Sequence, residues 1–116
     1  MTRIPFDYDR VLEEFCDNKE FIAKVINGFI DNSTRQIGII SEAINNSDAE
    51  IVRVEAHSIK GAALNLTANM LANIALELED IGESGILKGA EEKLRMLNKE
   101  LEEVRLYNQS LSAEKD

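Results

Sequence analysis

The chain has 116 residues and a formal net charge of -9, from 13 Lys and Arg against 22 Asp and Glu. A chain of this length suits one domain, over 1–116, with a single hydrophobic core. The negative charge repels phosphate backbones and anionic lipid headgroups, so nucleic acids and membrane surfaces are poor candidate partners. Cys16 is the only cysteine, which excludes an internal disulfide and fits a reducing compartment.

The N-terminal residues 1–15 do not resemble an export signal, because acidic residues stand where a signal peptide needs an apolar run. No segment approaches the roughly 20 apolar residues of a membrane-spanning helix. We therefore expect a cytoplasmic protein without a membrane anchor.

The first two predicted helices are a short one and a long one. One proline and six glycines in the whole chain leave long stretches free to be helical. The first helix covers about 7–15, with Asp7 as its N-cap. The second runs over about 19–44, where apolar residues recur at the three- and four-residue steps of one helical face.

The third predicted helix carries His57, the only histidine of the chain. Ser47 and Glu50 stand three residues apart, as in a capping box, and are expected to open this helix, which should end near Leu66. A fourth helix is expected over 70–81. The glycines of the GESG segment that follows suit its C-terminal cap.

The fifth predicted helix runs over about 86–107 and has a strict heptad pattern. Its apolar seam consists of Leu87, Ala90, Leu94, Leu97, Leu101 and Val104. Such a seam suits either a coiled-coil dimer or the last helix of an intramolecular bundle. We favour the bundle, and a monomer, because three other amphipathic helices must also bury an apolar face. The pattern predicts an all-α bundle over about 18–109 and a flexible tail over about 110–116.

A helical wheel places His57 on the polar side of its helix. Arg53, Lys60, Gly61 and Leu64 lie within about 60° of it. The opposite side is mainly apolar and holds Ile51, Val52, Ile59, Ala62, Ala63 and Leu66. The imidazole is therefore expected to face water, either as an idle surface side chain or as a reactive group. Glu55 falls on the apolar side, where a buried carboxylate would need a partner.

The neighbours of His57 suit a phosphoryl acceptor. A neutral imidazole keeps one ring nitrogen free near neutral pH and is then a good nucleophile. Lys60, one turn on, can place a cation beside phosphoryl oxygens. Gly61 would leave bare backbone where a side chain would block a partner. Glycine inside a helix costs about 1 kcal/mol relative to alanine, so access is a reason for its presence.

The stretch AHSIKGAALNL, followed by LANIALELEDIG, resembles the signature of the histidine-containing phosphotransfer (HPt) family. HSIKG is also similar to the phosphotransfer domain of chemotaxis histidine kinases. The resemblance covers nearly the whole chain. It implies an up-down-up-down four-helix bundle with a short extra N-terminal helix and an exposed histidine midway along the second bundle helix. It also implies that His57 is the phosphoacceptor, that Lys60 assists phosphate binding and that Gly61 is the small residue beside it.

The resemblance implies a phosphocarrier rather than an enzyme. Family members pass a phosphoryl group between the aspartates of receiver domains, and the Mg²⁺ and most catalytic groups belong to the receiver. The implied partners are response-regulator receiver domains and a hybrid or separate histidine kinase, and no cofactor is implied in this chain. A Gly-rich nucleotide loop is absent from the sequence, so phosphorylation directly from ATP is not expected.

Two positions depart from the family pattern. Ala62 stands where the family often has serine, and Thr67 stands where glycine commonly ends the histidine helix. The geometry of the turn at Thr67 is therefore left open. Leu64 and Arg53 are candidate partner-docking residues beside the histidine, although a single exposed leucine needs no functional explanation.

Two other functions are weighed against the phosphorelay carrier. One is an interaction module that binds signalling proteins without being phosphorylated. The other is a chemotaxis-type phosphotransfer domain that receives phosphate from ATP through a separate kinase domain. A metal site is rejected, because bundle metal sites pair Glu with His three residues later and Val54 stands at that position before His57. The acids of the fourth helix, Glu77, Glu79, Asp80 and Glu83, are instead assigned to a solvated face.

Overall fold

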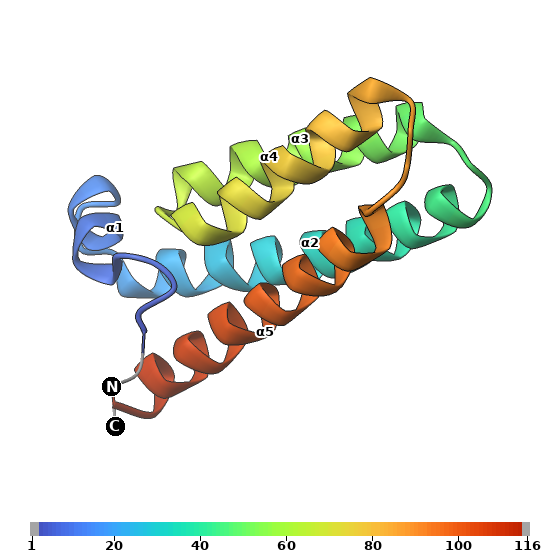
Figure 1. Ribbon diagram of the computed structural model, residues 1–116. Helices are drawn as coiled ribbons and strands as arrows, with labels where there is room; N and C mark the ends of the chain where they lie inside the picture. The colour runs from blue at the N-terminus through green and yellow to red at the C-terminus, as the bar shows by residue number, and fades with distance from the viewer. Residues whose placement is uncertain (1–2, 115–116) are drawn as a thin grey trace.

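The computed structural model describes residues 3–114 of the chain, and side chains up to residue 111. Five helices make up this part, which contains no strand. They are α1 (Tyr8–Glu14), α2 (Lys19–Asn45), α3 (Ala49–Asn65), α4 (Asn69–Ser84) and α5 (Ala90–Glu114). Figure 1 shows α3 and α4 lying over α2 and α5. The predicted all-α fold is confirmed.

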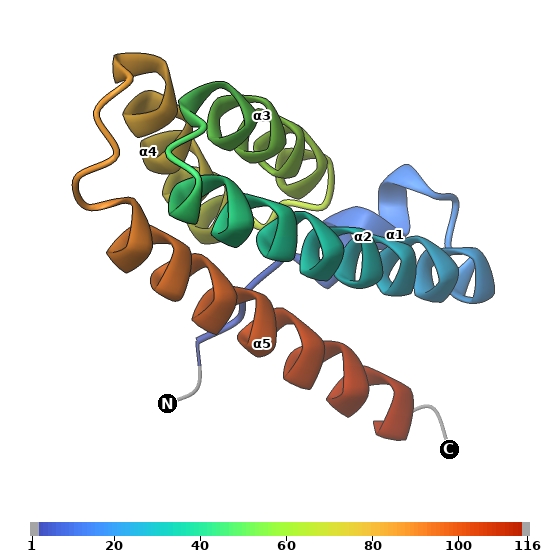
Figure 2. The same cartoon turned by 90° about the vertical axis from the view of Figure 1, so that its right-hand side faces the viewer.

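The four long helices close a ring of antiparallel neighbours. α2 packs against α3 and α5, and α4 packs against the same two helices. Figure 2 shows the α3–α4 hairpin as one layer and the α2 and α5 pair as the other. Among the helices described, the backbone of the short α1 lies close to that of α2. The chain is therefore a four-helix bundle with a short extra N-terminal helix.

The core is mainly aliphatic and also includes Phe6 and Phe29. Its largest fully buried side chains come from all five helices and include Val11, Ile22, Ile26, Ile40, Val52, Ile59, Leu71, Leu78, Leu97, Leu101 and Val104. The heptad seam of α5 is thus buried inside its own bundle, with Leu87 and Leu94 packed against it at the edge. A coiled-coil dimer through this seam would require the bundle to open.

The helix caps agree with the sequence-based prediction at some helix ends and differ from it at others. The Asp7 carboxylate accepts a hydrogen bond from the backbone N–H of Arg10, so this predicted N-cap is confirmed. The capping box at Ser47 is wrong: Asp48 is the N-cap of α3 and accepts from the N–H of Ile51. Ser47 instead has a left-handed backbone, with φ of 56°, in the turn before it.

The later helices begin and end at other residues than predicted. α4 continues beyond residue 81 to Ser84, where Gly85 is the expected left-handed cap with φ of 76°. α5 begins at Ala90 rather than at residue 86 and continues beyond 107 to Glu114. Of the predicted tail, residues 110–114 are therefore helical, and residues 115 and 116 lie outside the described part. No described helix is long and apolar enough to cross a membrane.

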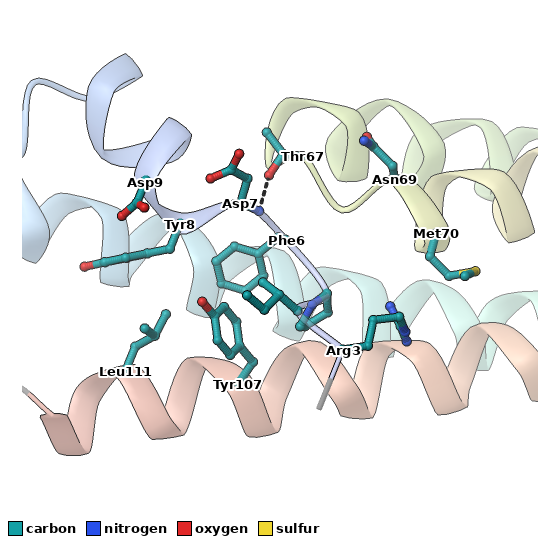
Figure 3. Close-up of a pocket in the computed structure, with 12 residues that line it drawn as sticks. Arg3, Phe6, Asp7, Tyr8, Asp9, Thr67, Asn69, Met70, Tyr107 and Leu111 are labelled. Carbon is teal, nitrogen blue, oxygen red and sulfur yellow. Dashed lines mark hydrogen bonds between the residues drawn. The ribbon is translucent and has the colours of Figure 1, made fainter. Parts of the chain in front are cut away.

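An N-terminal strap, residues 3–7, crosses the bundle and is held at three points, of which Figure 3 shows those at Phe6 and Asp7. Arg3 forms an ion pair with the buried carboxylate of Glu100. The ring of Phe6 is buried edge-on against Tyr107, with 5.0 Å between centroids. The backbone N–H of Asp7 donates to the Thr67 hydroxyl over 2.6 Å.

Thr67, left open by the sequence, adopts the left-handed backbone that a glycine would adopt, with φ of 58°. Its side chain offers what glycine lacks, a hydroxyl that ties the α3–α4 turn to the strap. This hydrogen bond offsets part of the cost of a left-handed backbone at a β-branched residue.

Candidate functional site

His57 lies on the outer side of α3, and 63% of its side chain is exposed. The apolar residues Val52, Ala56, Ile59 and Ala63 form the buried stripe of the same helix. The prediction that the imidazole faces water is confirmed. The wheel was wrong at two of its core positions, because Ile51 and Ala62 are exposed.

A carboxylate from α4 holds the imidazole. Oε2 of Glu79 lies 2.8 Å from Nδ1 of His57, and Oε1 lies 2.8 Å from Nζ of Lys60. Only 13% of the Glu79 side chain is exposed. With a carboxylate at Nδ1, the neutral ring carries its proton on that nitrogen and leaves the lone pair of Nε2 unprotonated. The arrangement fixes both the orientation and the tautomer of the imidazole.

Glu79 is held as an anion by these two neighbours. The hydrogen bond from the Lys60 ammonium is the main cause that lowers the pKa of the Glu79 carboxyl, and His57 lowers it further. Partial burial opposes them but does not reverse the direction. Lys60 is therefore already engaged in this state, rather than waiting unpaired for a phosphoryl group.

The close approach of α3 and α4 brings Glu79 within reach of His57. Gly82, one turn beyond Glu79, is buried in this interface. A Cβ at Gly82 would lie 2.6 Å from the backbone nitrogen of Arg53 and 2.9 Å from the carbonyl oxygen of Ala49. Only glycine lets the two backbones approach this closely. The sequence had assigned this glycine to the helix cap, whereas it lies inside α4.

Gly61 lies one turn after His57 and faces open space. No atom lies within 4 Å of the place where its Cβ would be. The surface at Gly61, beside the imidazole, is therefore open. Leu64, on the following turn, is 54% exposed.

Arg53, the other predicted docking residue, is turned toward its own helix. Its guanidinium forms an ion pair with Glu50, with 2.6 Å between Nε and Oε1. This pair raises the pKa of the Arg53 guanidinium and lowers the pKa of the Glu50 carboxyl. Among the predicted site residues, the structure thus joins His57 and Lys60 through Glu79, and it gives Arg53 a partner outside the site.

α2 contacts the site from the other side through a buried amide. Nε2 of Gln36 donates to the hydroxyl of Ser58 over 2.9 Å and to Oε1 of Glu55 over 3.2 Å. The sequence indicated that Glu55 would need a partner if its carboxylate were buried. Glu55 is half-buried, and Gln36 is its hydrogen-bond partner. The amide fixes α2 against the turn of α3 that carries His57.

Glu79 is the site residue that sequence reasoning missed. It was assigned with its neighbours to a solvated acidic face. A signal was present nonetheless: Ala68, in the turn, lies midway along the sequence between His57 and Glu79. Residues equally far from the turn of an antiparallel helix pair lie at the same height, so the two are expected to be near each other.

Comparison with known families assigns the chain to one of them. A family model described as the Hpt domain matches residues 24–107. The chain belongs to the Hpt domain family. Members are histidine phosphotransfer proteins of two-component phosphorelays, phosphocarriers rather than kinases, and interact with receiver domains and kinases. The match includes His57, Lys60, Gly61 and Glu79, and it begins after the strap and α1.

The fold of this Hpt domain is similar to that of a protein of known structure. The crystal structure of histidine-containing phosphotransfer protein B (HptB) from Pseudomonas aeruginosa PAO1 matches with a TM-score of 0.84 and 26% sequence identity. The match covers 94% of this chain and 95% of that one. A comparison with curated proteins finds no match.

Proposed function

We propose that this Hpt domain accepts a phosphoryl group on His57 from the aspartyl phosphate of one receiver domain and passes it to the aspartate of another. The observation that carries the proposal is the only imidazole of the chain, exposed on α3 with its Nδ1 held by Glu79. That contact leaves Nε2 as the nitrogen that can attack.

The proposed transfer needs no reactant other than the phosphorylated receiver and this chain. The lone pair of Nε2 forms the new P–N bond as the P–O bond to the donor aspartate breaks, and that aspartate leaves as a carboxylate. The ring gains positive charge, and the Glu79 carboxylate stabilises it through the proton on Nδ1. The reverse sequence delivers the phosphoryl group to the second receiver and restores the neutral imidazole.

Lys60 and Gly61 have supporting roles in this proposal. Lys60 shifts from Glu79 toward the phosphoryl oxygens, where its charge offsets theirs. Gly61 keeps the approach to Nε2 open. Mg²⁺ and the acid-base groups are supplied by the receiver, so this chain needs no cofactor of its own and no nucleotide site.

The test is intact mass after incubation of the protein with a panel of phosphorylated receiver domains. Wild type should gain a single acid-labile phosphoryl adduct, and His57→Gln should gain none. Because the His57 side chain is mostly exposed, the variant should keep the helical circular dichroism and melting temperature of wild type. A loss of several kcal/mol of stability would show instead that the imidazole supports the fold.

The other outcomes identify the alternatives. Binding to receivers without any adduct would favour an interaction module. An adduct that forms only with ATP and a separate kinase domain would favour the chemotaxis type. Wild type incubated with ATP alone should remain unmodified, and an adduct there would contradict the carrier assignment.

A further inference from the structure

A groove between α2 and α3 lies next to the candidate site. It has a volume of about 500 Å³, and Lys24, Gly28 and Arg35 line it from α2 while Ser58 and Ala62 line it from α3. The small residues among these keep it open. Ser58 directly follows His57, so this α2–α3 groove borders the imidazole on the side away from α4.

The charged residues that line the α2–α3 groove are basic, although the chain as a whole is acidic. Lys24 and Arg35 are its charged lining residues, and no acidic residue lines it. Both side chains are exposed, and neither forms an ion pair with any described residue. Asp31 lies on the same side of α2, four residues before Arg35, and it too forms no ion pair in this part of the chain.

The opposite side of His57 has the opposite charge. α4 packs against α3 there and carries four acids, Glu77, Glu79, Asp80 and Glu83. Lys60 and Lys93 already pair with Glu79 and Glu77, whereas Asp80 and Glu83 form no ion pair with a described residue. An acidic partner surface would therefore be repelled over α4 and attracted over the α2–α3 groove.

Building on the proposed function, we propose that Lys24 and Arg35 are specificity-determining residues that favour receiver domains presenting carboxylates to the α2–α3 groove. A phosphorylated receiver brings an anionic phosphoryl group to a chain of net charge -9, so long-range repulsion opposes the encounter. Two unpaired cations on one side of His57 reduce that repulsion locally and orient the partner. Such charges alter association rate and partner choice more than affinity.

The test measures the second-order rate of phosphoryl transfer to this protein from each member of a receiver panel, at low and at high salt. The variant is Lys24→Glu with Arg35→Glu. The matched control is Lys88→Glu with Lys99→Glu, which changes the net charge equally at two exposed cations that also form no ion pair with a described residue. Circular dichroism checks that both remain folded.

The groove variant should lose on the order of tenfold in rate at low salt for the receivers that wild type prefers. Most of this loss should disappear at high salt, because mobile ions screen exposed charges. The control should lose much less, and it should keep the order of preference among receivers. Equal losses in the two variants, or an unchanged order of preference in the groove variant, would overturn the inference.

The same experiment separates this inference from the proposed function. If wild type accepts a phosphoryl group and the two variants behave alike, the proposed function stands and the specificity role falls. If wild type accepts none from any receiver, the proposed function fails and the specificity role falls with it.

Discussion

The carboxylate of Glu79 lies 2.8 Å from Nδ1 of His57, although 22 residues separate the two along the chain. Its second oxygen lies equally close to the ammonium of Lys60. One partly buried anion thus orients the nucleophile and holds the cation that the transfer would use. The exposed face of the imidazole is left to the partner.

Replacing Glu79 with glutamine should slow phosphoryl acceptance without unfolding the protein. The amide keeps the shape of the side chain but loses the charge that fixes the Nδ1 proton and stabilises the charged ring. We expect a rate loss on the order of tenfold in transfer from a phosphorylated receiver. Glu77→Gln is the control, since Glu77 lies on the same helix and pairs with Lys93 instead. A full rate in Glu79→Gln would show that the carboxylate does not assist transfer.

The same variant should change how stability depends on pH. The folded pKa of Glu79 lies below its usual value of 4.5, mainly because of the hydrogen bond from Lys60. A carboxyl with a lowered folded pKa adds stability above its unfolded pKa, and that stability is lost as pH falls through the folded value. Urea unfolding in steps from about pH 5 to pH 3 should therefore show a steeper loss for wild type than for Glu79→Gln. Parallel curves would mean that Glu79 is not stabilised as an anion.

Gly61→Leu should block transfer while the fold remains intact. The position is exposed and its Cβ meets no atom, and leucine is a better helix former than glycine by up to about 1 kcal/mol. Stability should therefore stay the same or rise, while the side chain crowds the approach to His57. Gly61→Ala separates bulk from backbone effects and should retain most of the rate. Unimpaired transfer in the leucine variant would remove the access argument.

Gly82→Ala should destabilise the bundle. The added methyl group would meet backbone atoms of α3 at 2.6 and 2.9 Å, and backbone cannot move aside as a side chain can. We expect a loss of about 1–3 kcal/mol in the free energy of unfolding, measured by urea denaturation. Gly38→Ala, in the open part of α2, should instead gain up to about 1 kcal/mol. A neutral Gly82→Ala would show that α3 and α4 can separate at little cost.

Periodicity predicted the features that depend on a single helix. The number of helices and the exposure of His57 follow from the pattern within each helix. The seam of α5 was visible in the same way, but its place inside the bundle was favoured only because three other amphipathic helices must also bury a face. Asp7 was predictable as a cap because its contact is local. Asp48, rather than Ser47, caps α3 because the left-handed turn at Ser47 delays the start of the helix, and turn conformation is poorly encoded by residue type alone.

Features that depend on how two helices meet were not predicted. Ile51 and Ala62 stay exposed because the neighbours of α3 cover a narrower stripe than the wheel assumed. Glu79 was missed because its role requires the register of α4 against α3. That register in turn depends on Gly82, which lets α4 approach the backbone of α3 closely. The apolar pattern of a single helix does not predict such a contact.

The presence of one imidazole in the chain makes the site its own spectroscopic probe. In uniformly ¹⁵N-labelled protein, every imidazole nitrogen signal would arise from His57, so no selective labelling or assignment by mutation is needed. Tautomer, phosphorylation and the arrival of a receiver would each shift the same pair of resonances. A single titration could then follow the state of the nucleophile through a complete transfer.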